Sequence, residues 1–244
     1  MKYHPTVSSI RGLRRLSAGM VSALLICAIV PPATAAQERP AVGPGLNSYY
    51  RNADVARWQG IFERPGREIF DQRLRILQKI GLRPGMDVAD VGAGTGFFTL
   101  LFAEAVGPAG KVYAVDISEN FVADIRRRAA RHQMDNVEAI LNEQRDTRLP
   151  ADSVDLVFVC DTYHHFEYPR AMLDSIARAL RPGGELVVID FRRIPGVSTP
   201  WVMSHVRAAK EKVTTEIRAA GFALVEEQDF MRENYFLRFR KVSS

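Results

Sequence analysis

Residues 88–99 read Val88-Ala89-Asp90-Val91-Gly92-Ala93-Gly94-Thr95-Gly96-Phe97-Phe98-Thr99, and this stretch decides the fold of the 244-residue chain. An apolar run that contains one acid ends in alternating glycines, and a helical pattern of apolar residues follows at once. This order predicts a buried strand, a tight turn and a helix N-terminus. In that geometry the backbone approaches a ligand more closely than side chains would allow.

The spacing of the glycines separates two kinds of nucleotide site. The dinucleotide-binding fingerprint G-x-G-x-x-G needs a third glycine where this chain has Phe97. The chain instead has G-x-G-x-G at Gly92, Gly94 and Gly96, with Asp90 two residues before the first glycine. This pattern resembles motif I of the class I S-adenosylmethionine (SAM) dependent methyltransferases. An NAD(P)-dependent oxidoreductase is the less favoured interpretation.

Strand-like and helix-like segments alternate along the chain around this loop. The predicted strands are 87–91, 112–115, 137–141, 154–159 and 186–191, and the predicted helices are 97–106, 119–131, 170–180 and 210–220. Continuous apolar strands separated by helices indicate a doubly wound, mostly parallel α/β sheet that is covered on both faces.

Two features of the C-terminal half extend the resemblance. The segment 180–186 contains Pro-Gly-Gly and predicts a helix–turn–strand junction that is common in this family. Two further strands are predicted over 223–230 and 235–242, with only four residues between them. Because four residues cannot hold a crossover helix, this pair must be an antiparallel hairpin. The resemblance therefore implies a Rossmann-like sheet of seven strands that closes with a hairpin.

The N-terminal segment 1–36 has the order of a secretory signal peptide. A basic start precedes an apolar run over 20–30, and small residues end the segment at Ala35-Ala36. The apolar run is about half of the ~20 residues that a membrane span needs, so we expect a cleaved leader and no permanent span. The chain is then expected to be exported to the periplasm or secreted, with a cytoplasmic or leader-anchored location as the alternative.

The predicted organisation has four parts. They are a leader over 1–36, a flexible linker over 37–48, a helical lid over 49–84 and a SAM-binding domain over 85–244. The leader carries four of the net five positive charges, so the remainder is almost neutral. We interpret the three arginines at 126–128 as the solvated face of a helix. We therefore do not expect a nucleic-acid partner, and we expect the substrate to be a small molecule.

The resemblance assigns most of the cofactor-binding residues. They are Asp90, Gly92, Ala93, Gly94, Gly96, Asp116, Ile117, Asp146 and Asp161. Asp90 would organise the glycine loop and reach the methionine end of SAM. Asp116, the acid that ends a strand 20 residues after Gly96, would accept both ribose hydroxyls. The alternative for Asp116 is a solvated aspartate at a strand end.

The contact to adenine is assigned to Asp146. The segment after the third strand keeps the Leu149-Pro150 end of the family, but Asp146 lies three residues before the leucine where four are expected. Gln144 and Arg145 are the alternatives for this contact, and Asp146 would then be a surface residue.

Polar side chains follow the fourth strand in the segment 160–166, which resembles motif IV. Ligands bind at the carboxyl ends of strands in open α/β sheets. We therefore predict Asp161, His164 and His165 as catalytic residues, with Asp161 close to the methyl group or its sulfonium and one histidine as a general base. The alternative for either histidine is packing beneath the following helix.

The residues that contact the methyl acceptor are predicted mainly from the segments that flank the central motifs. The candidate substrate contacts are Trp58, Arg67, Tyr163 and His205. The alternative is a structural role in aromatic packing and surface ion pairs.

A metal ion is not expected. Two adjacent histidines could be metal ligands, but no third ligand has a recognisable spacing. Once the leader is removed, Cys160 is the single cysteine, which disfavours a cysteine-ligated zinc site.

The sequence therefore supports a SAM-dependent methyltransferase that transfers a methyl group by in-line displacement to a small molecule. The alternative from another class is an exported module that binds SAM or a nucleoside without turnover.

Overall fold

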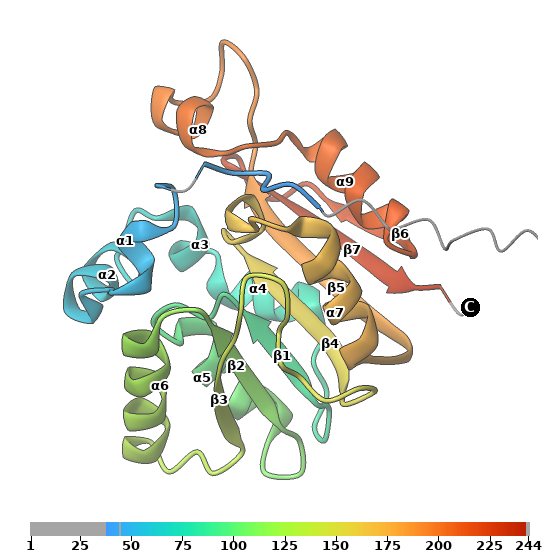
Figure 1. The fold of residues 1–244 in the computed structure, drawn as a ribbon. Helices are drawn as coiled ribbons and strands as arrows, with labels where there is room; N and C mark the ends of the chain where they lie inside the picture. Colours follow the sequence, from blue (N-terminus) through green and yellow to red (C-terminus); the bar gives the residue numbers. More distant parts are fainter. Residues whose placement is uncertain (1–37, 44, 243–244) are drawn as a thin grey trace, which may run out of the picture. The chain divides into compact units, whose positions relative to one another are not determined.

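The computed structural model describes residues 38–43 and 45–242, which form a seven-stranded sheet with helices on both faces (Figure 1). The strands are β1 (Val88–Val91), β2 (Val112–Asp116), β3 (Val137–Leu141), β4 (Val154–Cys160), β5 (Leu180–Phe191), β6 (Phe222–Gln228) and β7 (Asn234–Lys241). The helices are α1 (Ser48–Arg51), α2 (Val55–Phe62), α3 (Glu68–Asp71), α4 (Arg73–Ile80), α5 (Phe97–Val106), α6 (Glu119–Arg131), η1 (Tyr163–His165), α7 (Pro169–Ala179), α8 (Pro200–His205) and α9 (Lys210–Ala219).

The predicted leader over 1–36 lies outside the described residues, as does part of the predicted linker. In the portion of the chain that the structure describes, no helix has the length and apolar character needed to cross a membrane.

The order of the strands is β3-β2-β1-β4-β5-β7-β6. Strands β1 to β5 are parallel, and β7 runs antiparallel to both β5 and β6. The predicted sheet and its closing hairpin are confirmed. The burial of the last two strands agrees with this order. Strand β7 is mostly buried between its neighbours, whereas residues of β6 alternate between more buried and exposed positions, as at a sheet edge.

Alternate residues of the central strands fill two cores. In β4, Leu156 and Phe158 pack with α4 and α5 on one face of the sheet. Val157 and Val159 pack with α7 and α9 on the other face. Because both faces of the sheet are covered, the strand is continuously apolar from Leu156 onward rather than alternating with polar residues.

The start of β5 and the presence of helix α8 differ from the sequence-based prediction. The Pro-Gly-Gly segment lies within β5 as a bulge, because Val154 pairs with Leu180 and Leu156 already pairs with Glu185. Residues 181–184 therefore protrude from the ladder where a turn before the strand was predicted. Helix α8 was not predicted, although its start has a recognisable pattern. Thr199 caps the helix by accepting a hydrogen bond from the backbone nitrogen of Val202, and a proline follows the cap.

Candidate functional site

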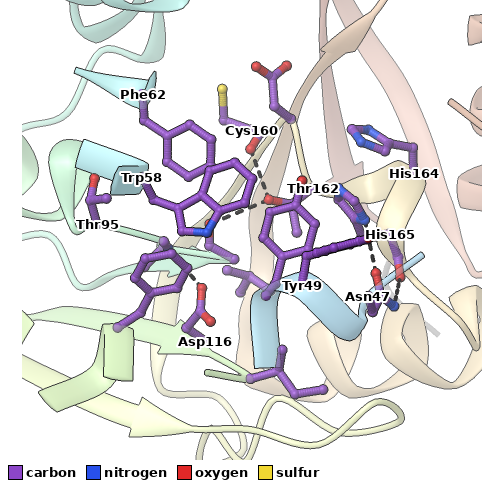
Figure 2. Close-up of a pocket in the computed structure, with 18 of the residues that line it drawn as sticks. Asn47, Tyr49, Trp58, Phe62, Thr95, Asp116, Cys160, Thr162, His164 and His165 are labelled. Carbon is purple, nitrogen blue, oxygen red and sulfur yellow. Dashed lines mark hydrogen bonds between the residues drawn. The ribbon is translucent and has the colours of Figure 1, made fainter. Parts of the chain in front are cut away.

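A cavity of about 1120 Å³ lies at the carboxyl ends of β1, β2 and β4 (Figure 2). It is lined by the segments that follow these strands and by residues of α1, α2 and α8. Figure 1 shows these three helices around the same end of the sheet. Sites for one small molecule occupy roughly 300–1,000 Å³. The volume therefore suits a nucleotide-sized cofactor together with a small second ligand.

The glycine loop after β1 approaches its neighbours too closely for side chains. Gly92 has a φ of +78°, and an added Cβ atom would lie 2.2 Å from Cγ2 of Thr162. Gly96 has a φ of +76°, and its added Cβ atom would lie 2.8 Å from Cγ1 of Ile125 in α6. Both conditions favour glycine. Residues 92–94 line the cavity, whereas Gly96 fixes the loop against α6.

The carboxylate of Asp116 joins this loop to the turn after β2. Its Oδ2 accepts a hydrogen bond from the backbone nitrogen of Gly94 (2.8 Å), and its Oδ1 accepts one from Ser118 (2.8 Å). Burial raises the pKa of Asp116 to about 6, although both N–H groups favour the charged form. Asp116 and Ile117 line the cavity, and each carboxylate oxygen can accept a further hydrogen bond.

Asp90 is buried within β1 and lines the same cavity. Its Oδ2 accepts a hydrogen bond from the hydroxyl of Thr99 in the first turn of α5 (2.7 Å). Burial raises the pKa of Asp90 to about 7, the Thr99 bond opposes this shift, and the charge of Asp116 adds to it. The loop is therefore flanked by two acids whose charge is costly in the absence of a cationic ligand.

Asp161 ends β4 in a left-handed conformation (φ of +47°) and lines the cavity. Its Oδ2 pairs with Nη2 of Arg67 at 2.7 Å, and its Oδ1 accepts a hydrogen bond from Nδ2 of Asn234 at 2.6 Å. Burial raises the pKa of Asp161 despite the opposing guanidinium. The structure thus joins a predicted catalytic residue to Arg67, a predicted substrate contact.

The adjacent histidines His164 and His165 are each held through Nδ1. The Nδ1 of His164 lies 2.7 Å from Oδ1 of Asp190, and the Nδ1 of His165 lies 2.9 Å from Oδ1 of Asn47. Burial lowers the pKa of His165 to about 2, and the neighbouring histidines add to this effect. A pKa this low makes the His165 imidazole a weak proton acceptor, which disfavours it as a general base.

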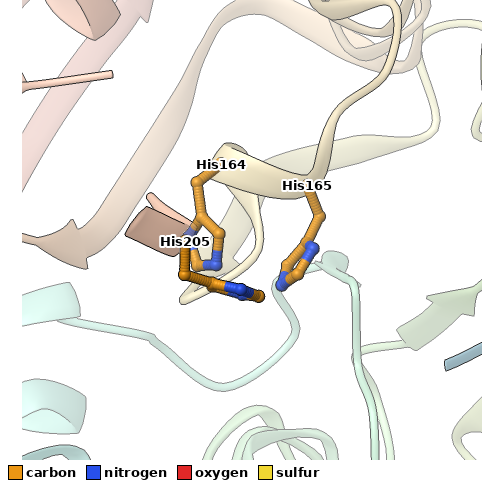
Figure 3. A group of neighbouring side chains, drawn as sticks. All are labelled: His164, His165 and His205. Carbon is orange, nitrogen blue, oxygen red and sulfur yellow. The ribbon is translucent and has the colours of Figure 1, made fainter. Parts of the chain in front are cut away.

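His205 at the end of α8 brings a third imidazole to this pair (Figure 3). One ring nitrogen of each of His164, His165 and His205 lies within 4.8 Å of the others. The His205 ring also stacks on Trp201, with 4.6 Å between the ring centroids. The predicted substrate contact at position 205 thus lies directly beside the predicted catalytic histidines.

Aromatic side chains of the N-terminal helices cover the cavity. Trp58 stacks on Tyr50 and contacts Phe62, with ring centroids 4.8 Å and 5.0 Å apart. Arg128 in α6 forms a bidentate ion pair with Glu63 and so holds the C-terminal end of α2. The interpretation of all three arginines at 126–128 as a solvated face was thus wrong for Arg128, which is mostly buried in this ion pair.

Like Gly96, the predicted site residues Asp146 and Tyr163 do not line the cavity. Asp146 accepts hydrogen bonds from the Ser175 hydroxyl (3.0 Å) and the Arg178 guanidinium (2.9 Å) of α7, so its carboxylate holds a loop to that helix. Gln144, an alternative for the adenine contact, does line the cavity. Tyr163 is fully buried, and its hydroxyl donates to Glu216 of α9 (3.0 Å). The geometry therefore gives Asp146 and Tyr163 structural contacts.

Sequence reasoning did not identify four residues whose side chains hydrogen-bond to the predicted site residues Asp90, Asp161, His164 and His165. They are Thr99, Asn234, Asp190 and Asn47. Asp190 could have been found, because it is an acid within an apolar strand, which is the pattern that identified Asp90. Asn47 and Asn234 have no local pattern, since their contacts join segments more than 70 residues apart.

Comparison with known proteins agrees with the fold. A family model described as "Methyltransferase domain" matches residues 82–235. The chain is 35% identical over 131 residues to nocamycin O-methyltransferase of Saccharothrix syringae, a match that covers 53% of this chain and 47% of that protein. It is 33% identical over 115 residues to the ubiquinone/menaquinone biosynthesis C-methyltransferase UbiE of Hydrogenovibrio crunogenus, which covers 47% of this chain and 45% of that protein.

The chain spans about half the length of the curated relatives it matches. Among solved structures, a SAM-dependent methyltransferase from Aquifex aeolicus superposes with a TM-score of 0.68 and 26% identity. That match covers 78% of this chain and 100% of the other.

Proposed function

This chain belongs to the methyltransferase-domain family, and we propose that it transfers a methyl group from SAM to a small-molecule acceptor. One observation carries this proposal. The glycine loop is hydrogen-bonded to the carboxylate of Asp116, and both line a cavity large enough for two ligands. Two features disfavour a nicotinamide-dependent enzyme. Phe97 occupies the position of the third glycine in the dinucleotide-binding fingerprint, and β7 is antiparallel to β5.

Buried polar atoms at the nucleoside end of the cavity fit such a cofactor. Within the described residues, Oγ1 of Thr95 and Oδ1 of Asn142 are buried without a hydrogen-bond partner, and both residues line the cavity. Buried polar groups are rarely left unpaired in native proteins, so these atoms indicate a polar ligand. The residues that would hold it are the loop 92–94, Asp116 and, at the base, Gln144.

Bound SAM supplies an electrophilic methyl group on a positively charged sulfonium. The chain's own contribution is to orient the acceptor and exclude water, and positioning of this kind supplies up to about 7–11 kcal/mol. Trp58 and Phe62 would close the cavity over the ligands, and the Arg67–Asp161 pair would orient the acceptor. The aromatic walls favour a planar or apolar acceptor.

Calorimetric titration of the purified chain with SAM and with NADH tests the proposal. We expect SAM to bind and NADH not to bind. Asp116→Ala should weaken SAM binding at least tenfold, and Asp146→Asn, which alters a carboxylate outside the cavity, should leave it unchanged. A folded protein that binds NADH but not SAM would overturn the proposal.

We also propose, from the sequence of residues 1–36, that the chain is exported. Export motivates the second candidate function, an SAM- or nucleoside-binding module without turnover, since SAM is made in the cytoplasm. Cell fractionation and sequencing of the mature N-terminus test this. A full-length chain confined to the cytoplasm would contradict export.

A further inference from the structure

Three imidazoles from two distant segments converge beside the cofactor cavity. His164 and His165 lie in η1 after β4, and His205 ends α8. Their ring centroids are 4.2 Å, 5.2 Å and 5.1 Å apart, and one nitrogen of each lies within 4.8 Å of the others (Figure 3). All three side chains line the cavity.

The outer nitrogens of the first two rings are fixed by buried partners. Oδ1 of Asp190 accepts from Nδ1 of His164, and Asp190 is itself held by the backbone nitrogens of His164 and Phe191. Nδ2 of Asn47 donates to the backbone oxygen of His165 and to Glu167, which leaves its Oδ1 to accept from Nδ1 of His165. In its neutral form, each ring therefore carries its lone pair on Nε2.

The third ring has an unsatisfied nitrogen. Nε2 of His205 is buried and has no hydrogen-bond partner among the residues described. A buried polar atom without a partner is costly, so this arrangement calls for a ligand. Metal-bound histidines typically donate their second ring nitrogen to a carboxylate or carbonyl oxygen, as His164 and His165 do here.

We propose that His164, His165 and His205 bind one divalent transition-metal ion of the zinc class, with an open coordination position toward the cavity. Three histidines plus an open position are a known arrangement for catalytic zinc. Zinc–nitrogen bonds of about 2.0–2.1 Å place tetrahedral ligands ~3.3 Å apart, so the rings must close by about an ångström or more. We expect rotation of the His205 side chain to accompany metal binding.

This proposal replaces the sequence-based expectation of no metal. That expectation depended on ligand spacing, and the third ligand lies 40 residues after His165, where no spacing rule applies. The site also gives both adjacent histidines a role other than general base.

Resting on the proposed methyltransferase function, the site predicts the class of acceptor. If such an ion were bound, an acceptor hydroxyl or thiol on it would lose its proton to solvent near neutral pH, as metal-bound water does. The acceptor oxygen or sulfur would form a bond to the methyl carbon as the sulfonium carbon–sulfur bond breaks, and a neutral thioether would leave. Acceptors with an ionisable hydroxyl or thiol are therefore expected.

Titration of the chelator-treated full chain with Zn²⁺, and with Co²⁺ as a coloured probe, tests the site without SAM. We expect one equivalent to bind, with a Co²⁺ absorption spectrum of nitrogen ligation. His205→Ala should weaken binding at least tenfold, and His132→Ala, which removes an exposed imidazole at the end of α6, should not.

Asp190→Asn provides a second variant that retains all three ligands. It should weaken binding by roughly 10–100-fold, as loss of an outer carboxylate does. The proposal fails if the folded wild-type chain binds no equivalent of either ion, or if His205→Ala and Asp190→Asn both bind like the wild type. SAM titration of the same sample separates the two proposals: SAM binding without metal binding overturns only the metal site, and metal binding without SAM binding overturns the methyltransferase.

Discussion

At the scale of single residues, the site depends on acids buried at the ends of apolar strands. Asp90 stands out in the sequence because an unpaired charge within an apolar strand is costly, whereas Asp116 was assigned through the family resemblance. Asp190 is likewise a buried acid within an apolar strand, and it was not predicted. The position of His205 could not be predicted, because it depends on how α8 packs against η1 rather than on any local pattern.

Asp90→Asn should change the pH dependence of stability. The pKa of Asp90 is 3.8 unfolded and about 7 folded, so its stabilising contribution is complete below pH 3.8 and is lost as the pH rises through 7. Between pH 5 and 8 the ligand-free wild type should lose about 2–3 kcal/mol relative to the variant. Urea unfolding of both proteins measures the difference in their free energies of unfolding. A difference that does not vary with pH would contradict the raised pKa of Asp90.

Gly92→Ala should damage the cofactor loop. The added Cβ atom strains a positive φ and meets Thr162 at 2.2 Å, so the loop or the end of β4 must move. Gly66→Ala is a matched control, because Gly66 has a φ of +89° and open space around its Cα. We expect SAM affinity to fall at least tenfold in the first variant and to be unchanged in the second, as measured by calorimetry. Equal affinities would show that the close approach does not shape the site.

At the scale of elements, short N-terminal helices are fastened over a site that belongs to the sheet. The sequence predicted a helical lid over 49–84, and the structure has four short helices, α1 to α4, over 48–80. Their fastening comes from side chains far apart in sequence, such as Glu63 with Arg128 and Gln59 with Asp124. Interactions of this kind leave no periodic pattern, which is why the role of Arg128 was not predicted.

Arg128→Met should loosen α2 and the glycine loop together. The Arg128 guanidinium pairs with Glu63 and also donates to the backbone oxygen of Thr95 (2.7 Å). Hydrogen bonds of charged groups contribute about 1.5–3 kcal/mol, so the KM for SAM should rise roughly tenfold. Arg131→Met, on an exposed position of the same helix, is the control. An unchanged KM would mean that α2 does not help to hold the cofactor.

At the scale of the whole molecule, the order of the strands creates the site. Parallel strands β1, β2 and β4 end at one edge, so the residues that follow them meet around one cavity. This convergence was predictable, because the apolar strand pattern and the short final connection determine the sheet and its hairpin. The bulge in β5 and the contacts of Asp146 with α7 were not, since both depend on tertiary packing.

The central claim is methyl transfer in this cavity. The most direct test incubates the full chain with methyl-labelled SAM and small acceptors that carry hydroxyl or thiol groups, and measures the label in each acceptor together with S-adenosylhomocysteine. We expect both products from wild type and Asp146→Asn, and neither from Asp116→Ala. Tight SAM binding with no label transferred to any acceptor would contradict the claim and favour a binding module.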